Sequence, residues 1–228
     1  MLFWLFCILI YMAILTQKQI LERVQSGNIG FKPGLDEFQV QAHAIDMRLG
    51  YTFLLPKSWH LTDKGREALY IDHYDKNRQD YFDVIELEKG QIFELLPGEY
   101  VLASTLESVK IPDDLMAVLY PRSSTNRKGL SVDLTGIIDS GYEGQLVIPI
   151  RNNTGSQVVK LYPGERFCQI VFERLEESVT AEKSRYHMKD IVDGFIQTKD
   201  GKKKRDLDEL QYVSNGKITE LKAERKIQ

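Results

Sequence analysis

The sequence has little of what disulfide-stabilised and zinc-dependent proteins require. Its 228 residues include only two cysteines, Cys7 and Cys168, so the chain has no disulfide framework and no C-x-x-C ligand pair. The four histidines are scattered, and none falls in an H-E-x-x-H or H-x-E arrangement. These absences exclude a structural zinc site, the zinc hydrolases and the zinc-type deaminases.

An excess of positive charge is also missing. The chain carries 30 Lys and Arg against 33 Asp and Glu, which gives a net charge of −3. Without an overall basic field there is no main driving force for binding nucleic acid, so we expect no nucleic-acid partner. A hydrophobic content of 43% with 28% charged residues is ordinary for a folded chain, and the length fits one domain of above-average size.

The longest apolar run is too short to cross a bilayer as a helix. Residues 1–15 are all apolar, but a spanning helix needs about 18–20 such residues. No Lys or Arg precedes the run and no A-x-A-like cleavage site follows it, which weakens the interpretation as a secretory signal. Three alternatives stay open: a weak anchor, a cleaved signal, and a natural start at Met12 with residues 1–11 as an upstream extension. The last is favoured, and we expect a cytoplasmic protein.

The remaining chain predicts a mainly β fold after one short helix. Apolar residues recur at helical spacing between Thr16, a plausible N-cap, and Gly27. From residue 40 onward, short apolar runs alternate with Gly, Pro, Asn and Asp turns. The expected strands are 45–53, 91–96, 100–104, 116–120, 145–150, 158–162 and 167–172. Many short strands at this spacing are typical of a β-barrel or jelly roll.

Two polar stretches interrupt or follow this pattern. Residues 56–90 are charge-rich and predict a long surface excursion. Near the C-terminus, a Lys/Arg cluster at 202–205 and many alternating charges predict a tail that is helical and solvated, or disordered. We therefore expect one domain at 12–190 and a charged tail at 191–228.

Residues with chemical potential concentrate between positions 121 and 172. A predicted strand ends at Pro121 and is followed by a group of cations and hydroxyls that can hold polyphosphate oxygens: Arg122, Ser123, Ser124 and Arg127. The segment Gly136–Ile137–Ile138–Asp139 then ends an apolar strand in a carboxylate, with Tyr142 after a turn. A Pro-Gly turn at 163–164 precedes Gln169. Each residue alone also has an ordinary structural explanation, so the inference rests on their combination.

In this order and spacing, the segments PRSS, GIIDSGYEG and PGERFCQI resemble the motifs of the trimeric dUTPase and dCTP deaminase superfamily. The resemblance covers roughly residues 12–190. Upstream, residues 41–50 look like the first motif, with Asp46 in the place of its acidic residue. The resemblance implies a distorted β-barrel, a homotrimer with active sites between subunits, and a Mg²⁺-bound nucleoside triphosphate as substrate.

The resemblance also implies a role for each motif residue. Asp139 activates a water for attack on the α-phosphorus. The hairpin at 132–138, with Gly136 and Ile138, reads the base through main-chain groups, and Tyr142 lies under the sugar. Asp46 supports the metal through water. The triphosphate ligands implied are Arg122, Ser123, Ser124, Arg127 and Gln169, and the candidates for a closing lid are Tyr186 and Phe195.

The choice between the two branches depends mainly on Pro149. Deaminases of the superfamily use a glutamate on the strand after the third motif, and Pro149 stands there in this chain, where it cannot carry a proton. Tyr142 and the interval from Arg122 to Asp139 also favour the dUTPases. In the other direction, Arg127, the N-terminal helix and the middle excursion favour the deaminases, and Asp133 is an alternative carboxylate.

We therefore expect a dUTP diphosphatase that forms dUMP and pyrophosphate from deoxyuridine triphosphate. The alternatives are a dCTP deaminase, or a bifunctional enzyme that does both reactions. A nucleotide-binding protein without catalysis is the third hypothesis.

Overall fold

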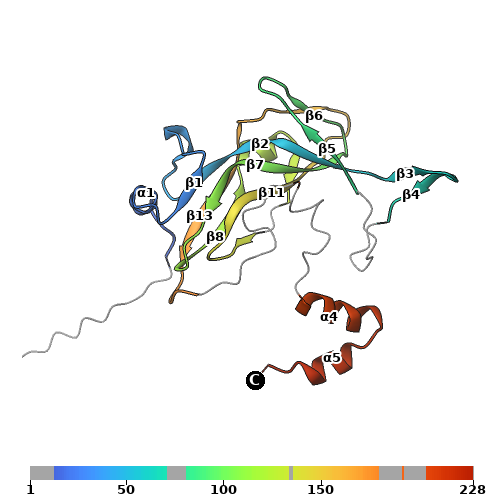
Figure 1. The fold of residues 1–228 in the computed structure, drawn as a ribbon. Helices are drawn as coiled ribbons and strands as arrows, with labels where there is room; N and C mark the ends of the chain where they lie inside the picture. The colour runs from blue at the N-terminus through green and yellow to red at the C-terminus, as the bar shows by residue number, and fades with distance from the viewer. Residues whose placement is uncertain (1–12, 71–80, 134–135, 180–191, 193–203, 228) are drawn as a thin grey trace, which may run out of the picture.

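The computed structural model describes residues 13–70, 81–133, 136–179, 192 and 204–227 (Figure 1). Its strands are β1 (Gly30–Lys32), β2 (Ile45–Pro56), β3 (Trp59–Thr62), β4 (Gly65–Ala68), β5 (Phe82–Glu86), β6 (Phe93–Leu95), β7 (Tyr100–Lys110), β8 (Leu115–Pro121), β9 (Leu130–Val132), β10 (Ile137–Ile138), β11 (Glu143–Asn152), β12 (Val159–Leu161) and β13 (Arg166–Arg174). Its helices are α1 (Gln17–Gln25), the short 3₁₀ helix η1 (Glu37–Gln39), α2 (Ser123–Arg127), α4 (Lys204–Ser214) and α5 (Ile218–Glu224).

A curled antiparallel sheet forms the body of the protein. Its strands follow the order β10-β8-β13-β2-β7-β11-β9, and β1 and β5 pair with β7 and β2. Strands distant in sequence therefore become neighbours, with β13 between β8 and β2. The pair β6 and β12 adds a second small sheet. This arrangement, visible in Figure 1, confirms the mainly β fold expected from the sequence.

The core lies inside the curl of this sheet and follows from alternation along the strands. In β11, every second residue from Gly144 to Asn152 is buried, as expected when one face packs on a core. Aromatic side chains fill the interior, where the rings of Phe53 and Phe93 stack with centroids 4.5 Å apart. Phe167 and Phe172 of β13 are also fully buried there.

Helix α1 begins and ends where the sequence predicts. Thr16 is the N-cap, its backbone N–H donates to Gln19 Oε1 at 3.0 Å, and Gly27 follows the helix with φ +74°. Ile20 anchors the helix because its side chain is fully buried in the core. The chain before the helix is tied to the end of β13, since the N–H of Leu15 donates to Phe172 O at 3.0 Å.

All the expected strands are present, although several are longer than predicted. The polar excursion after residue 56 contains the β3-β4 hairpin and β5, which pairs with β2. The tail forms helices α4 and α5, joined by a hydrogen bond from the Tyr212 hydroxyl to Glu224 and by an ion pair between Arg225 and Asp208. Among the described residues, no helix is long and apolar enough to span a bilayer. Residues 1–12 lie outside the described residues.

The close approach of β2 to β7 predicts that Gly50 tolerates no side chain. An added Cβ would lie 2.3 Å from Ser104 Oγ and 2.9 Å from the Ser104 carbonyl oxygen, and the backbone oxygen cannot rotate away. Gly50→Ala should therefore lower the free energy of unfolding by about 1–3 kcal/mol in urea titrations. Gly34→Ala is the control, because its Cβ would meet nothing within 4 Å. Equal stability of the two variants would contradict this packing.

Candidate active site

The predicted triphosphate ligands lie at the corner where β8 passes into α2. Arg122 directly follows β8, and Ser123 and Ser124 open α2. The corner is fastened to β13 because the buried hydroxyl of Thr125 donates to Phe167 O at 3.0 Å. Ser123 is exposed and Ser124 is half-buried. Both residues therefore lie near the surface, and they directly follow Arg122 in the sequence.

A buried carboxylate holds this guanidinium in place. Asp46 lies in β2 and is only 2% exposed, yet Arg122 Nε lies 3.1 Å and Arg166 Nη1 lies 3.3 Å from its Oδ2. Arg122 also donates through Nη1 to the carbonyl oxygen of Arg166 at 3.0 Å. Burial raises the pKa of Asp46, and the charges of Arg122, Arg166 and Arg48 oppose that rise. One carboxylate thus orients two arginines from different strands.

A second buried carboxylate lies behind Asp46. Glu107 of β7 is 1% exposed, and it accepts hydrogen bonds from Gln39 Nε2 at 2.8 Å and from the backbone N–H of Arg48 at 3.0 Å. Gln39 Nε2 also donates to the Asp46 carbonyl oxygen at 2.9 Å, so it joins the two residues. Burial raises the pKa of Glu107 as well. The network fixes the backbone of β2 beneath the arginines.

Most other cations near this corner are already paired. Arg48 binds Asp36 at 2.7 Å, and Lys128 binds Glu165 at 2.6 Å. Arg127 is exposed at the end of α2 and makes no ion pair among the described residues. It is therefore a cation available to a phosphate group.

Gln169 lies where the sequence places it, beside the arginine cluster. In β13 it is the register partner of both Asp46 in β2 and Tyr120 in β8. Its Nε2 reaches Pro121 O at 3.5 Å, a long hydrogen bond, so the amide retains donor and acceptor capacity. The structure thus brings together Asp46, Arg122 and Gln169 from three strands.

Asp139 and Tyr142 lie elsewhere, in a turn docked on the β7-β8 loop. Asp139 is exposed, whereas the next residue, Ser140, is buried and donates to Leu115 O at 2.6 Å. The Tyr142 N–H donates to Asp139 O at 3.2 Å, and its hydroxyl donates to Gln145 O at 2.6 Å. The Tyr142 ring packs partly against the core, which gives this residue a structural role in the isolated chain.

The base-reading hairpin predicted at 132–138 runs between β9 and β10. Gly136 has φ +80° and its carbonyl oxygen accepts from Leu119 N at 3.0 Å, while Ile138 is buried opposite Ala117 of β8. Residues 134–135 lie outside the described residues.

Within one chain, Asp139 and Arg122 are far apart. Because Ile138 pairs with Ala117, Asp139 falls near the first residues of β8, whereas Arg122 follows its last residue. About six strand positions at about 3.3 Å each give a separation of roughly 20 Å along β8. One chain therefore does not place these two residues side by side.

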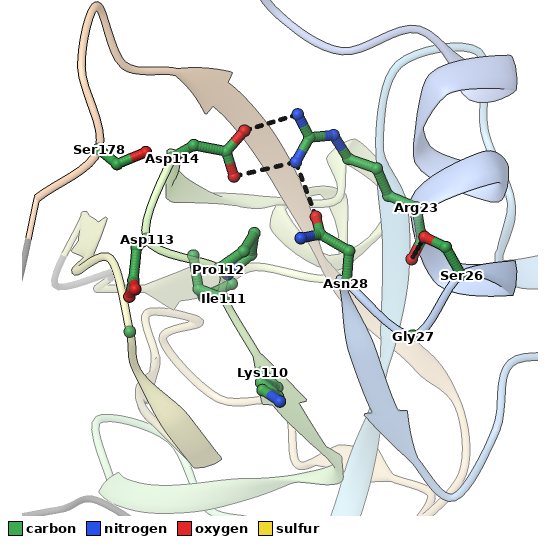
Figure 2. Close-up of a pocket in the computed structure, with 11 residues that line it drawn as sticks. Arg23, Ser26, Gly27, Asn28, Lys110, Ile111, Pro112, Asp113, Asp114 and Ser178 are labelled. Atoms are coloured by element: carbon green, nitrogen blue, oxygen red, sulfur yellow. Dashed lines mark hydrogen bonds and ion pairs between the residues drawn. The ribbon is translucent and has the colours of Figure 1, made fainter.

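A cavity of about 870 Å³ lies beside the Asp139 turn, since Gly141 belongs to its wall. Figure 2 shows the labelled side chains around this cavity. Arg23 of α1 crosses the cavity and makes two hydrogen bonds to Asp114, at 3.0 and 2.7 Å, and one to Asn28 at 2.7 Å. Lys110 also lines the cavity and makes no ion pair among the described residues. The predicted phosphate ligands do not line it.

The residues at the arginine corner do not form a protein-held metal site. Among the described residues, no group of three or more His, Cys, Asp or Glu side chains is arranged to hold a metal ion. The Asp46 carboxylate is engaged by Arg122 and Arg166, and its role in supporting a metal through water stays a prediction. The predicted lid residues Tyr186 and Phe195 lie outside the described residues.

Comparison with known proteins identifies the family. The family model for dCTP deaminase-like proteins matches residues 14–175. The chain belongs to the dCTP deaminase-like family. This result confirms the superfamily expected from the motifs.

Curated relatives carry a more specific name. The "dCTP deaminase, dUMP-forming" of Methanosphaera stadtmanae is 40% identical over 166 residues, which cover 72% of this chain and 80% of the relative. The protein of the same name from Dictyoglomus turgidum is 41% identical over 164 residues, covering 71% and 80%. The solved 2′-deoxycytidine 5′-triphosphate deaminase from Agrobacterium tumefaciens has a TM-score of 0.54 and 26% identity, covering 72% of this chain and 49% of that one.

The prediction of a dUTP diphosphatase is wrong, because these relatives are dCTP deaminases that form dUMP. The choice of the dUTPase branch depended mainly on Pro149, a single position, and on Tyr142. Features spread over a longer part of the chain, namely helix α1, the excursion after residue 56 and Arg127, indicated the correct branch. The chain is thus related to enzymes of nucleotide metabolism, as expected, but on the deaminase side.

Three residues of the arginine corner were not predicted from the sequence. Arg166 stands in the quoted PGERFCQI segment but received no role, and Gln39 and Glu107 were not considered. A signal for Gln39 existed, since Asp36 and Gln39 have capping-box spacing and the Asp36 N–H donates to Gln39 Oε1 at 3.1 Å. Glu107 gave no signal, because a carboxylate inside a strand is ordinarily taken as exposed.

Asp46→Asn should destabilise the protein, because it removes the anion that pairs with the partly exposed Arg122 and Arg166. We expect the free energy of unfolding to fall by about 1.5–3 kcal/mol in denaturant titrations. Glu94→Gln is the matched control, since it removes the same charge from an exposed pair with Lys160 at 3.7 Å, where a loss under about 1 kcal/mol is expected. A loss for Asp46→Asn no larger than the control's would refute the anchoring role.

Proposed function

We propose that this protein is a dUMP-forming dCTP deaminase, which converts dCTP and two waters to dUMP, ammonia and pyrophosphate. The observation that carries the proposal is 40% identity to relatives of that name along 80% of their length. The site agrees with it, because cations suited to a triphosphate and a separate exposed carboxylate both occur in the described residues.

Two hydrolytic steps divide the site residues between them. Arg122, Arg127 and Gln169 bind the triphosphate, with the Ser123 and Ser124 hydroxyls beside them, through charge-assisted hydrogen bonds. Asp139 positions and deprotonates the water that attacks the α-phosphorus, a contribution of about 10²–10⁴ in rate. The hairpin around Gly136 and Ile138 reads the base, and Tyr142 supports the sugar.

Mg²⁺ enters this proposal as part of the substrate. A hard cation of this kind prefers phosphate oxygens and water to a protein cage. Magnesium supplies charge neutralisation to the triphosphate, while the protein supplies orientation through Arg122 and Arg127.

The separation of Asp139 and Arg122 within one chain supports a homotrimer with sites shared between subunits. Roughly 20 Å lie between them along β8 of one chain, so a complete site needs Asp139 of one subunit and Arg122 of another. The cavity beside the Asp139 turn offers space for a second chain, and its wall includes Lys110, which makes no ion pair among the residues that the structure describes. Closed rotational symmetry makes every such site equivalent.

The purified protein should release both ammonia and pyrophosphate from dCTP in the presence of Mg²⁺, with dUMP as the nucleotide product. The two small products should appear in equal amounts, and chromatography should identify dUMP. Asp139→Asn should lower pyrophosphate release by about 100-fold or more while nucleotide binding stays within about tenfold. Pyrophosphate without ammonia, or neither product, would refute the proposed reaction.

Two variants that each lack pyrophosphate release should restore it to each other if active sites are shared between subunits. Arg122→Ala and Asp139→Asn subunits, co-expressed in equal amounts, place both intact residues in about a quarter of the sites of a closed ring. We therefore expect about a quarter of the wild-type rate of pyrophosphate release from the mixture and almost none from either variant alone. Light scattering on the same samples gives the oligomeric state. No recovery in mixed trimers would show that each site is built within one chain.

A further inference from the structure

Asp133 occupies a distinctive place at the end of β9. Its backbone N–H donates to Pro149 O at 3.0 Å, which continues the register of Val132 with Ile150 and Ser131 with Arg151. Asp133 is therefore the cross-strand neighbour of Pro149. Directly opposed residues of antiparallel strands project from the same face, with their Cβ atoms about 4.5–5.5 Å apart.

The surroundings of Asp133 leave its carboxylate available. The side chain is exposed and makes no ion pair among the described residues. On the same face, the neighbouring row of paired residues contains Tyr100, Arg151 and Ser131. Burial raises the pKa of Tyr100, the charge of Asp133 raises it further, and Arg151 lowers it. No other carboxylate occurs in this row or in the row of Leu102, Pro149 and Asp133.

The proposed reaction requires two carboxylates in different places. The α-phosphorus and C4 of cytosine lie on opposite sides of the sugar in dCTP. Asp139 therefore cannot serve both water attacks. Asp133 lies at the start of the hairpin whose Gly136 and Ile138 are assigned to the base, and Asp139 lies at its end. Pro149 has no group that can accept a proton, whereas the side chain opposite it does.

We infer that Asp133 is the proton acceptor for deamination, an inference that rests on the proposed function. The oxygen of a water bonds to C4 of cytosine while one of its protons passes to the Asp133 carboxylate. This proton is then delivered to the exocyclic nitrogen. The C4–N bond breaks, ammonia leaves, and the remaining hydroxyl proton moves to N3. Cytosine and water thereby become uracil and ammonia.

The test measures ammonia from dCTP in Asp133→Asn, with dUTP as a second substrate that bypasses the deamination step. Asn keeps the backbone N–H that pairs with Pro149, so the strand pairing is retained. We expect ammonia release to fall by about 100-fold or more, whereas conversion of dUTP to dUMP stays within about threefold of wild type. Asp63→Asn, at the exposed β3-β4 turn, is the matched control and should retain both activities.

A second variant separates loss of a carboxylate from loss of structure. Adding Pro149→Glu to Asp133→Asn places a carboxylate on the adjacent strand of the same face, and ammonia release should recover at least about tenfold. Absence of recovery, retention of ammonia release in Asp133→Asn, or equal loss of both activities would each overturn the role of Asp133. Absence of ammonia from wild-type protein would instead refute the proposed function itself.

Discussion

The burial of Asp46 between two arginines is the constraint on which the rest of the candidate site depends. A charge that is 2% exposed is tolerated only when it is paired and hydrogen-bonded. Arg122 and Arg166 supply the pairing: Arg166 belongs to β13, and Arg122 directly follows the neighbouring strand β8. The β-sheet order therefore determines where these two arginines meet Asp46. Gln39 and Glu107 complete the arrangement by fixing β2 from behind.

The same sheet separates the arginine corner, proposed to bind the triphosphate, from the carboxylates proposed to activate water. The arginine corner lies at one end of β8, and the Asp139 turn lies at the other. Pro149 of β11 and its cross-strand neighbour Asp133 lie apart from both, next to the hairpin assigned to the base. A rigid framework that holds phosphate, sugar and base contacts at fixed intervals suits a reaction with two separate water attacks. In the proposed homotrimer, association of subunits would bring the separated parts together.

Local signals predicted much of this fold, and non-local pairing explains what they missed. Thr16 and Gly27 marked helix α1 correctly, and turn residues marked every expected strand. The strand predicted at 100–104 ended too early, because Thr105 and Glu107 are polar. In the structure both side chains are buried and hydrogen-bonded within β7. The motif residues Arg122 and Gln169 were predicted to share a site, and they lie together. The partners of Asp46 could not be predicted, since they depend on which strands become neighbours.

The central claim is that one protein directs one water to C4 of the base and another to the α-phosphorus of dCTP. It can be tested by running the reaction in H₂¹⁸O and analysing the product by mass spectrometry. Deamination introduces one oxygen at C4 of the base, and attack at the α-phosphorus introduces another on the phosphate of dUMP. We predict dUMP with two ¹⁸O atoms, one in the base fragment and one in the phosphate fragment. A product with unlabelled base, or with the phosphate label in pyrophosphate instead, would contradict the account.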